Sequence, residues 1–295
     1  MINRIIEVAE TPARLRVDLG RLAVDVVGQS TVFVPMKEIA AIVVSNPAVS
    51  LTQAVLSELA GQGGVFVAMS EQFLPVAMML PLETHGTQTA RMGKQAEASE
   101  PTKKRAWQTI VRAKVRAQWA LLAALGRPEP GLEVLIKAVQ SGDIKNIEAQ
   151  AAARYWKVLF GPAFRRDRDA FDQNRLLNYG YAVLRAATAR AICGAGLHPC
   201  LGVQHHNKYN PYCLADDLME PYRPLVDRVV LTIVERDGAQ VEMSKVVRGE
   251  IISALLGRHQ VRNEERTLFD LLSRSAASCA RVLTGEDREL DLWVP

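Results

Sequence analysis

The sequence predicts an α+β protein with a small N-terminal β-rich, sandwich-like domain over residues 1–82 and a larger all-helical domain over residues 83–295. Two observations support this division. Up to residue 80 the apolar residues occur in short β-branched runs, and beyond residue 86 they recur at the spacing of long helices. Residues 81–86 contain Pro and Gly between the two patterns, which is typical of a linker.

Strands are expected in the first domain wherever apolar and polar residues alternate or β-branched residues cluster. The expected strands span residues 15–19, 22–26, 30–34, 39–44, 65–69 and 73–80. The run 39–44 is continuously apolar, which indicates a buried strand. Ser50 or Thr52 can cap one helix, which is expected to run to Ala60 and to end at the glycines that follow.

Long helices are expected throughout the second domain. They span residues 87–98, 103–125, 132–140, 143–160, 175–195, 225–235, 244–257 and 264–284. Gly126, Gly161-Pro162 and Gly196 fall between these segments, as expected of residues that end helices.

Composition excludes several classes of protein. A hydrophobic share of 48% and a charged share of 23% are ordinary for a folded domain and argue against wholesale disorder. No stretch approaches the roughly 18 apolar residues of a membrane span, and the first ten residues carry charges where a secretory signal needs an apolar run. The four cysteines are therefore expected to be reduced thiols of a cytoplasmic protein.

Positive charge is concentrated in one stretch, although the net charge is only +4. Residues 1–90 hold five Lys and Arg against eight Asp and Glu, residues 91–127 hold nine against two, and the remainder holds 22 of each. A basic helix suits a phosphate backbone, and the alternative is a solvated helix face. Trp107 and Trp119 lie in this stretch and are expected to face the core.

Three segments of the second domain carry candidate chemistry. Glu148 lies in a predicted helix of small residues, with a solvent-facing carboxylate as the alternative. His205 and His206 lie in a polar loop, where adjacent side chains diverge, so we expect at most one to serve a site. Asp217 and Glu220 are three residues apart and share one helix face, which requires a compensating cation. Carboxylates with one imidazole suit Mg²⁺ or Mn²⁺ better than Zn²⁺.

A zinc site is the competing metal hypothesis. Its possible ligands fall within 21 residues and are Cys193, His198, Cys200, His205, His206 and Cys213. Their spacing has no paired C-x₂-C, and Cys193 lies at an apolar helix end, where a buried thiol is the simpler interpretation. A structural zinc protein is therefore the less favoured interpretation.

Four motifs in order resemble the CRISPR-associated spacer-acquisition integrases, the universal adaptation endonucleases of CRISPR systems. The motifs are Asn146-Ile147-Glu148-Ala149 with Tyr155-Trp156, residues 174–181 (NRLLNYGY), Gly202-Val203-x-His205, and residues 217–224 (DLMEPYRP). The resemblance covers essentially the whole chain, and the form of the last two motifs is most similar to that in type II systems.

The resemblance implies a site and an activity. Glu148, His205 and Glu220 match the metal-binding catalytic residues of the family, Asp217 matches an acidic position that assists them, and His206 has no family role. The implied reaction is attack of a prespacer 3′-hydroxyl on a phosphodiester of the CRISPR array, with Mg²⁺ or Mn²⁺ at the site. Because an imidazole must be neutral to bind a metal, activity should fall at acid pH.

The resemblance also implies partners. Two copies pair through their β-rich domains, and two such homodimers flank a dimer of a small ferredoxin-fold adaptation partner in a heterohexamer. The complex holds double-stranded prespacer DNA and the leader-repeat DNA of the array. Lys208 and Arg223 match basic positions near DNA in other members, and charge placement adds Lys103, Lys104, Arg105, Arg165 and Arg166 as DNA-binding candidates.

A binding role without chemistry is the alternative function. The same sequence features would suit a DNA-binding assembly scaffold whose acidic cluster is purely structural. No Gly-rich phosphate loop is evident, and the transesterification needs no nucleotide.

Overall fold

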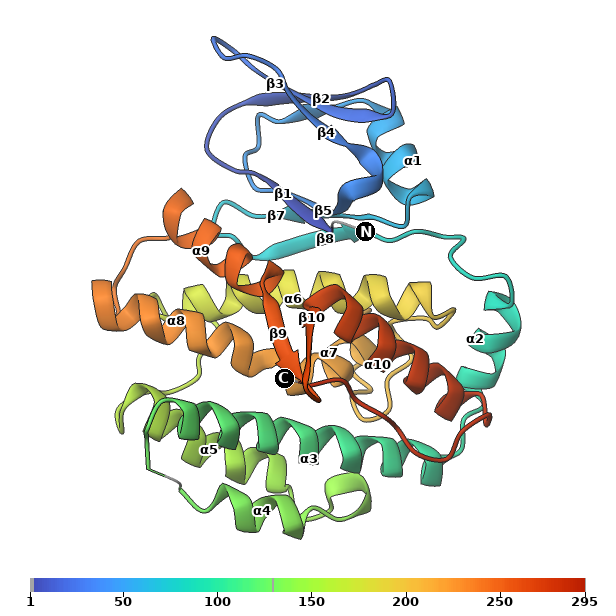
Figure 1. The fold of residues 1–295 in the computed structure, drawn as a ribbon, viewed down its shortest axis with the longest axis vertical. Coiled ribbons are helices and arrows are strands. Elements are labelled where there is room, and N and C mark those ends of the chain that lie inside the picture. The colour runs from blue at the N-terminus through green and yellow to red at the C-terminus, as the bar shows by residue number, and fades with distance from the viewer. Residues whose placement is uncertain (1–2, 129, 295) are drawn as a thin grey trace.

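In the computed structural model, a β-rich region sits on top of a layered helical body (Figure 1). The structure describes residues 3–128 and 130–294. The order of a β-rich region followed by a helical one confirms the predicted α+β class. The first region ends with β8 (Pro75–Met79), and the second begins with α2 (Gln88–Ala96).

Two four-stranded sheets build the N-terminal region. The first has the order β1 (Arg4–Val8), β5 (Ile39–Val44), β7 (Val65–Met69) and β8, with only β8 antiparallel to its neighbour. The second has the order β4 (Val32–Pro35), β3 (Arg21–Val26), β2 (Ala13–Asp18) and β6 (Ser50–Leu51), with η1 (Met36–Glu38) and α1 (Gln53–Gly61) alongside. The strand predicted at 39–44 is β5, whose apolar residues lie between two neighbouring strands.

The two faces of β5 belong to two different hydrophobic cores, one shared with the second sheet and α1 and the other shared with the helices. Leu15 and Leu22 of the second sheet pack with Ile42, and with Leu59 of α1. Ala41 and its neighbour Val43 belong instead to the large core shared with the helices. Because successive side chains of a strand point to opposite faces, a continuously apolar strand is what this double burial requires.

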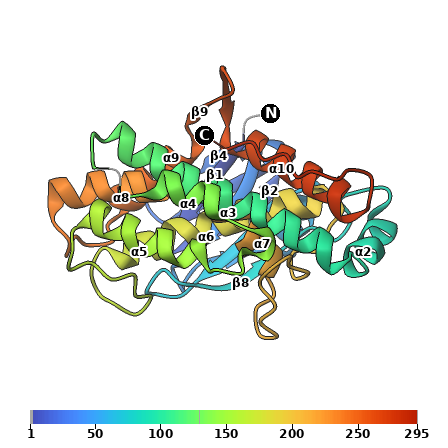
Figure 2. The same ribbon diagram turned by 90° about the horizontal axis from the view of Figure 1, so that it is seen from below.

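The other helices of the body lie around α6 (Asn174–Gly194) (Figure 2). Most side chains of α6 are buried. The other helices are α3 (Glu100–Ala124), α4 (Leu132–Ala138), η2 (Ser141–Asp143), α5 (Ile147–Phe160), α7 (Cys213–Met219), η3 (Glu220–Tyr222), α8 (Arg223–Asp237), α9 (Lys245–Leu256) and α10 (Leu268–Leu283). Trp107 of α3 is buried as expected, but the same expectation for Trp119 is wrong, because that ring is 36% exposed.

The expectation of an uninterrupted helix over residues 264–284 is wrong in its first turn. Residues 258–267 form a hairpin of β9 (Arg258–Val261) and β10 (Glu264–Thr267), and α10 starts only at Leu268. The intervening Arg262 and Asn263 have φ angles of 50° and 67°. Such a left-handed pair makes a tight hairpin turn between the two strands.

Two further expectations concern thiols and membranes. All four cysteines, which lie among the described residues, are free, and burial raises the pKa of Cys193 to about 11, which keeps it a thiol. None of the helices within residues 3–128 and 130–294 is long and apolar enough to cross a membrane.

A buried arginine joins the β-rich region to the helices. Arg248 of α9 is 1% exposed and donates from Nε to Glu7 Oε1 at 2.8 Å, and it also pairs with Glu10. The same Glu7 oxygen accepts from the Tyr179 hydroxyl of α6 at 2.6 Å. The β1 carboxylate is thus held by two helices that are far away in sequence.

We expect Arg248→Met to lower the free energy of unfolding by about 2–4 kcal/mol, because it leaves the Glu7 carboxylate partly buried without its cation. Urea unfolding monitored by circular dichroism measures the change. Arg258→Met, which removes an ion pair between two exposed side chains, is the control and should change stability little. Equal effects of the two substitutions would contradict a junction role for Arg248.

Candidate active site

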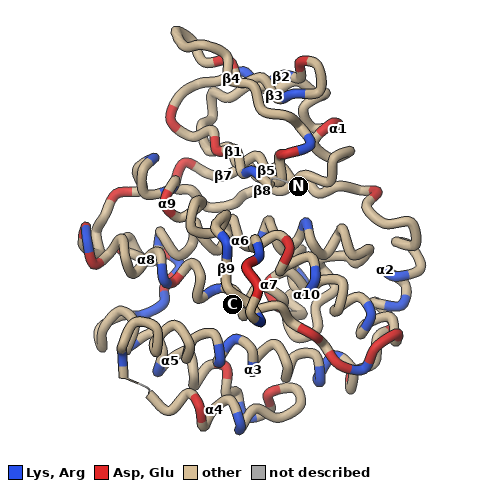
Figure 3. Tube along the Cα trace, viewed as in Figure 1, with Lys and Arg blue, Asp and Glu red and all other residues tan. Residues whose placement is uncertain are grey.

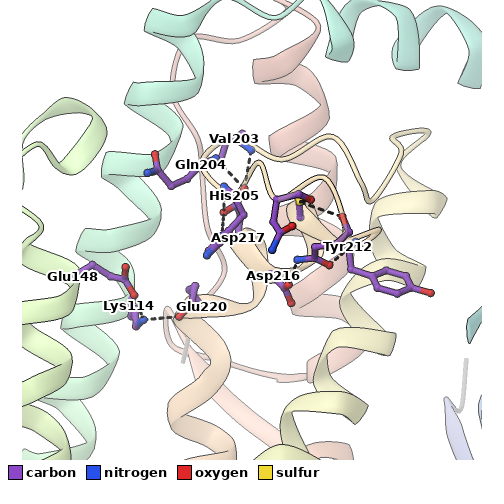
Figure 4. Close-up of polar contacts among 12 residues, drawn as sticks. Lys114, Glu148, Val203, Gln204, His205, Tyr212, Asp216, Asp217 and Glu220 are labelled. Carbon is purple, nitrogen blue, oxygen red and sulfur yellow. Dashed lines mark hydrogen bonds and ion pairs between the residues drawn. The ribbon is translucent and has the colours of Figure 1, made fainter. Parts of the chain in front are cut away.

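Side chains from three parts of the chain meet beside α3 (Figure 4). Lys114 comes from the middle of α3, Glu148 from the first turn of α5, and Glu220 from the start of η3. His205 and Asp217 lie next to them, on the loop before α7 and on α7 itself. The predicted Glu148, His205, Asp217 and Glu220 therefore gather in one region of the fold.

The turn before α5 fixes the position of Glu148. Asp143 and Asn146 have left-handed φ angles of 47° and 51°, so the helix predicted from residue 143 begins only at Ile147. The Asp143 carboxylate accepts hydrogen bonds from the backbone N–H groups of Ile147 and Glu148, both at 2.9 Å. These bonds satisfy free N–H groups at the helix start, which places Glu148 in the first turn.

The Asp217 carboxylate organises the loop that carries His205. Asp217 is fully buried and accepts hydrogen bonds from the backbone N–H groups of Val203 at 2.7 Å, Gln204 at 3.0 Å and His205 at 3.3 Å. A Cβ atom at Gly202 would lie 2.5 Å from the His205 carbonyl oxygen and 2.9 Å from the carboxylate. The Gly202-Val203-x-His205 motif is thus the sequence of a loop folded around a buried anion.

Asp217 also sets the orientation of the His205 ring. Nδ1 of His205 lies 2.6 Å from Asp217 Oδ1, and the ring packs edge-on against Trp107 with its centroid 5.9 Å away. The hydrogen bond to Asp217 raises the pKa of His205, although burial opposes the charged form. Because Nδ1 is occupied, Nε2 is the ring nitrogen that can bind a ligand.

Lys114 lies between the two glutamates. Its Nζ is 2.5 Å from Glu148 Oε1 and 2.6 Å from Glu220 Oε2 (Figure 4). Burial opposes its charge, but Glu220 and Glu148 outweigh burial and raise the pKa of Lys114. Sequence reasoning counted Lys114 among the residues of a DNA-facing basic stretch, and that interpretation is wrong, because the side chain is buried against two carboxylates.

Arg223 forms an ion pair with the Glu220 oxygen that Lys114 does not contact. The guanidinium lies 3.0 Å from Glu220 Oε1 and 4.5 Å from the centre of the Tyr181 ring. Burial would raise the pKa of Glu220, but Arg223 and Lys114 reverse the effect and hold that pKa below its usual value. The carboxylate is therefore ionised despite being only 4% exposed.

The donor set fits a hard divalent ion in its chemistry. Two carboxylates and one imidazole suit Mg²⁺ or Mn²⁺. Glu220 Oε2 is buried, and its contact is the ion pair with Lys114. Among the described residues, however, no three His, Cys, Asp or Glu side chains converge closely enough to hold a metal. An ammonium separates the two glutamates instead.

The residues of the zinc hypothesis do not converge in this way either. Cys193 is buried near the end of α6. Cys200, His206 and Cys213 line one hollow, but no three His, Cys, Asp or Glu side chains within residues 3–128 and 130–294 come close enough together to hold a metal. Burial raises the pKa of the Cys200 and Cys213 thiols, which disfavours the thiolate that zinc requires.

The predicted DNA-contact residues occupy several surfaces. Lys104, Arg105, Arg165 and Lys208 are exposed, and Lys103 is largely covered beside Glu100. Figure 3 shows basic positions spread along α2 and α3. Arg166 donates to the side-chain oxygens of Asn174 at 2.9 Å and Asn178 at 2.6 Å.

A cavity of about 280 Å³ is lined by arginines, one of which is Arg223, the partner of Glu220. Its basic lining residues are Arg166, Arg168, Arg185 and Arg223. Charge placement in the sequence also offers Arg168 as a phosphate contact. Arg185 is the basic lining residue that sequence reasoning missed, because helical spacing did not show that it lines the same cavity as Arg223.

The comparisons with known proteins agree with this fold. The family model described as "CRISPR associated protein Cas1" matches residues 6–256, so the chain belongs to the Cas1 family. A curated relative, the CRISPR-associated endonuclease Cas1 of Neisseria meningitidis serogroup C (strain 8013), is 39% identical over 243 residues, covering 81% of this chain and 78% of the relative.

Two solved structures share the fold. A casposase bound to its integration product superposes with a TM-score of 0.79 at 20% identity, covering 98% of this chain and 92% of the casposase. A chain of a Cas6-RT-Cas1–Cas2 complex superposes with a TM-score of 0.77 at 17% identity, covering 99% of this chain and 36% of that chain.

The buried Asp227 makes the stability of the fold depend on pH. Asp227 accepts hydrogen bonds from the Tyr155 hydroxyl at 2.8 Å and from the Tyr181 hydroxyl, and burial raises its pKa from 3.8 to about 6. The folded protein therefore binds more protons than the unfolded chain between about pH 4 and pH 6. This contribution to stability is complete below pH 4 and is lost as the pH rises through about 6.

We expect the stability advantage of wild type over Asp227→Asn to shrink by on the order of 3 kcal/mol between pH 4 and pH 7. Chemical unfolding of both proteins across this range measures the difference, with Asp169→Asn, at an exposed aspartate, as the control. Parallel stability profiles of wild type and Asp227→Asn would contradict the raised pKa.

Proposed function

We propose that this protein is a metal-dependent DNA integrase and endonuclease that inserts prespacer DNA into a CRISPR array. The observation that carries the proposal is the grouping of Glu148, His205 and Glu220 around α3, with Asp217 orienting the imidazole. Membership of the Cas1 family and a relative named as an endonuclease support the same activity.

The proposed reaction exchanges one phosphodiester for another. A prespacer 3′-hydroxyl attacks a phosphorus of the repeat and forms a new P–O bond. The bond from that phosphorus to the 3′-oxygen of the repeat breaks, and this oxygen takes up a proton and leaves as a 3′-hydroxyl. If water attacks instead, the outcome is hydrolysis. Glu148, His205 and Glu220 would hold Mg²⁺ or Mn²⁺, which when bound supplies charge stabilisation at the phosphoryl oxygen and favours ionisation of the attacking hydroxyl.

Residues of the chain prepare the site for this reaction. Asp217 holds Nδ1 of His205, which leaves Nε2 as the ligand atom, and Arg223 keeps Glu220 ionised. The arginine-lined cavity that includes Arg223 would hold a DNA phosphate close to the reacting one. The exposed Lys104, Arg105, Arg165 and Lys208 would hold phosphates farther along the DNA.

The proposed assembly follows the two regions of the fold. A division near residue 82 would leave a β-rich domain for homodimer contacts and a helical domain for catalysis. The exposed apolar side chains of Val32 and Phe33 on β4, a strand of the second sheet, support a protein contact there. The Cas6-RT-Cas1–Cas2 complex among the similar structures supports a Cas2 partner for this chain. We further propose that this partner is the small ferredoxin-fold adaptation protein, and that two homodimers flank one partner dimer in a heterohexamer.

We expect Glu220→Ala and His205→Ala each to reduce strand transfer by about 100-fold or more in Mn²⁺ or Mg²⁺ while prespacer binding is retained. Gel-based strand transfer and a binding titration on the same preparations separate the two effects. His206→Ala is the matched control, since that ring is exposed on the neighbouring residue. Full strand transfer by both site variants would favour the alternative of a DNA-binding scaffold with a structural acidic cluster.

DNA affinity should fall steeply with salt, because phosphate contacts release counterions. Replacing Lys103, Lys104 and Arg105 together by Ala should reduce the slope of log affinity against log salt by about 2. Fluorescence anisotropy with labelled duplex DNA at several salt concentrations measures the slope. Lys137→Ala, at an exposed lysine of α4, provides the comparison, and an unchanged slope in the triple variant would exclude these residues from the DNA contact.

A further inference from the structure

Lys114 is a cation built into the acidic site. We propose that it acts as an internal counter-ion, which holds Glu148 and Glu220 together before a divalent ion binds and competes with that ion for the same two carboxylates. The inference rests on the proposed function, because it takes these glutamates as metal ligands. It adds a residue that controls how readily the site accepts its metal.

The geometry makes Lys114 the only bridge among described residues between the two glutamates. Its Nζ contacts one oxygen of each, at 2.5 Å and 2.6 Å. Glu148 and Glu220 come from α5 and η3, which both pack against α3. Two carboxylates so close to one point repel each other unless a positive charge lies between them. A divalent ion held by both would need the same position.

Arg223, the second cation of the site, does not lie between the two glutamates. Of the two glutamates, Arg223 contacts Glu220, through the oxygen that Lys114 does not contact, and it also lines the arginine-lined cavity. It therefore does not join the two carboxylates, and it can stay beside Glu220 when a metal binds on the opposite side. Lys114 alone must give up a contact.

The buried surroundings of Lys114 strengthen its competition with a divalent ion for the two glutamates. The side chain is only 9% exposed, and its helix neighbours Val111, Val115 and Gln118 are buried on the same face of α3. An ammonium held in this environment cannot move freely into water. Charges interact more strongly where water is excluded, so a divalent ion entering beside Lys114 meets repulsion as well as occupied ligands.

Two consequences follow from this arrangement. Without metal, the site is already assembled, since Lys114 neutralises the repulsion that would otherwise separate α5 from η3. With metal, part of the binding free energy is used to displace the ammonium, so the affinity for the ion is lower than the ligand set alone would give. Removing the positive charge should change both properties in opposite directions.

Manganese binding to the full-length, DNA-free protein tests the inference. Free Mn²⁺ is measured by electron paramagnetic resonance during titration of wild type and Lys114→Met, in which an uncharged side chain of similar length replaces lysine. We expect Lys114→Met to bind Mn²⁺ about 10-fold more tightly. The metal-free variant should also melt at a lower temperature than wild type and gain more thermal stability from added Mn²⁺.

Controls separate this inference from the metal assignment itself. Lys137→Met removes an exposed lysine on α4 and should bind Mn²⁺ like wild type. If the Lys114→Met variant does not fold without metal, the Lys114→Gln variant is titrated in its place. Mn²⁺ binding that is equal or weaker in the Lys114 variants would overturn the counter-ion role. Mn²⁺ binding that survives in Glu220→Gln would instead overturn the proposed metal site.

Discussion

The buried Asp217 carboxylate is the interaction on which the arrangement of the site depends. The carboxylate has no exposure to solvent, so its hydrogen-bond partners must lie inside the protein. It accepts hydrogen bonds from the three backbone N–H groups of residues 203–205, and it also contacts Nδ1 of the His205 ring. One anion thereby folds the loop, selects the ring nitrogen that remains available and places His205 beside the glutamates. The position of the candidate histidine is thus determined by the hydrogen bonds of one buried carboxylate.

Charge compensation extends from this carboxylate through the rest of the site. Lys114 lies between Glu148 and Glu220, Arg223 holds the second oxygen of Glu220, and the Tyr155 and Tyr181 hydroxyls satisfy Asp227 behind them. Buried acidic groups are stable only with such partners. In the proposed mechanism, a divalent ion entering this network would take the place of the ammonium between the two glutamates, which would link metal binding to the position of a lysine.

Local sequence patterns predicted the strands and helices that bury a regular face or nearly their whole surface. The alternating strands β2 and β3, the apolar strand β5 and the long helices α3 and α6 follow from periodicity, because each buries one regular face or nearly all of its surface. The short strands β1 and β6 and the hairpin β9–β10 were missed. Their pairing depends on partners and on left-handed turn residues that no local pattern reveals.

The sequence alone determined the family resemblance and, through motif order, proposed Glu148, His205, Asp217 and Glu220 as site residues. Only the tertiary structure decided how charges pair. Lys114 belongs by sequence to a basic stretch whose sum suggests DNA, yet α3 turns its side chain inward against residues 34 and 106 positions later in the chain. The reason is physical: a sequence sets how many charges exist, whereas packing decides which ones leave water and must find an opposite charge.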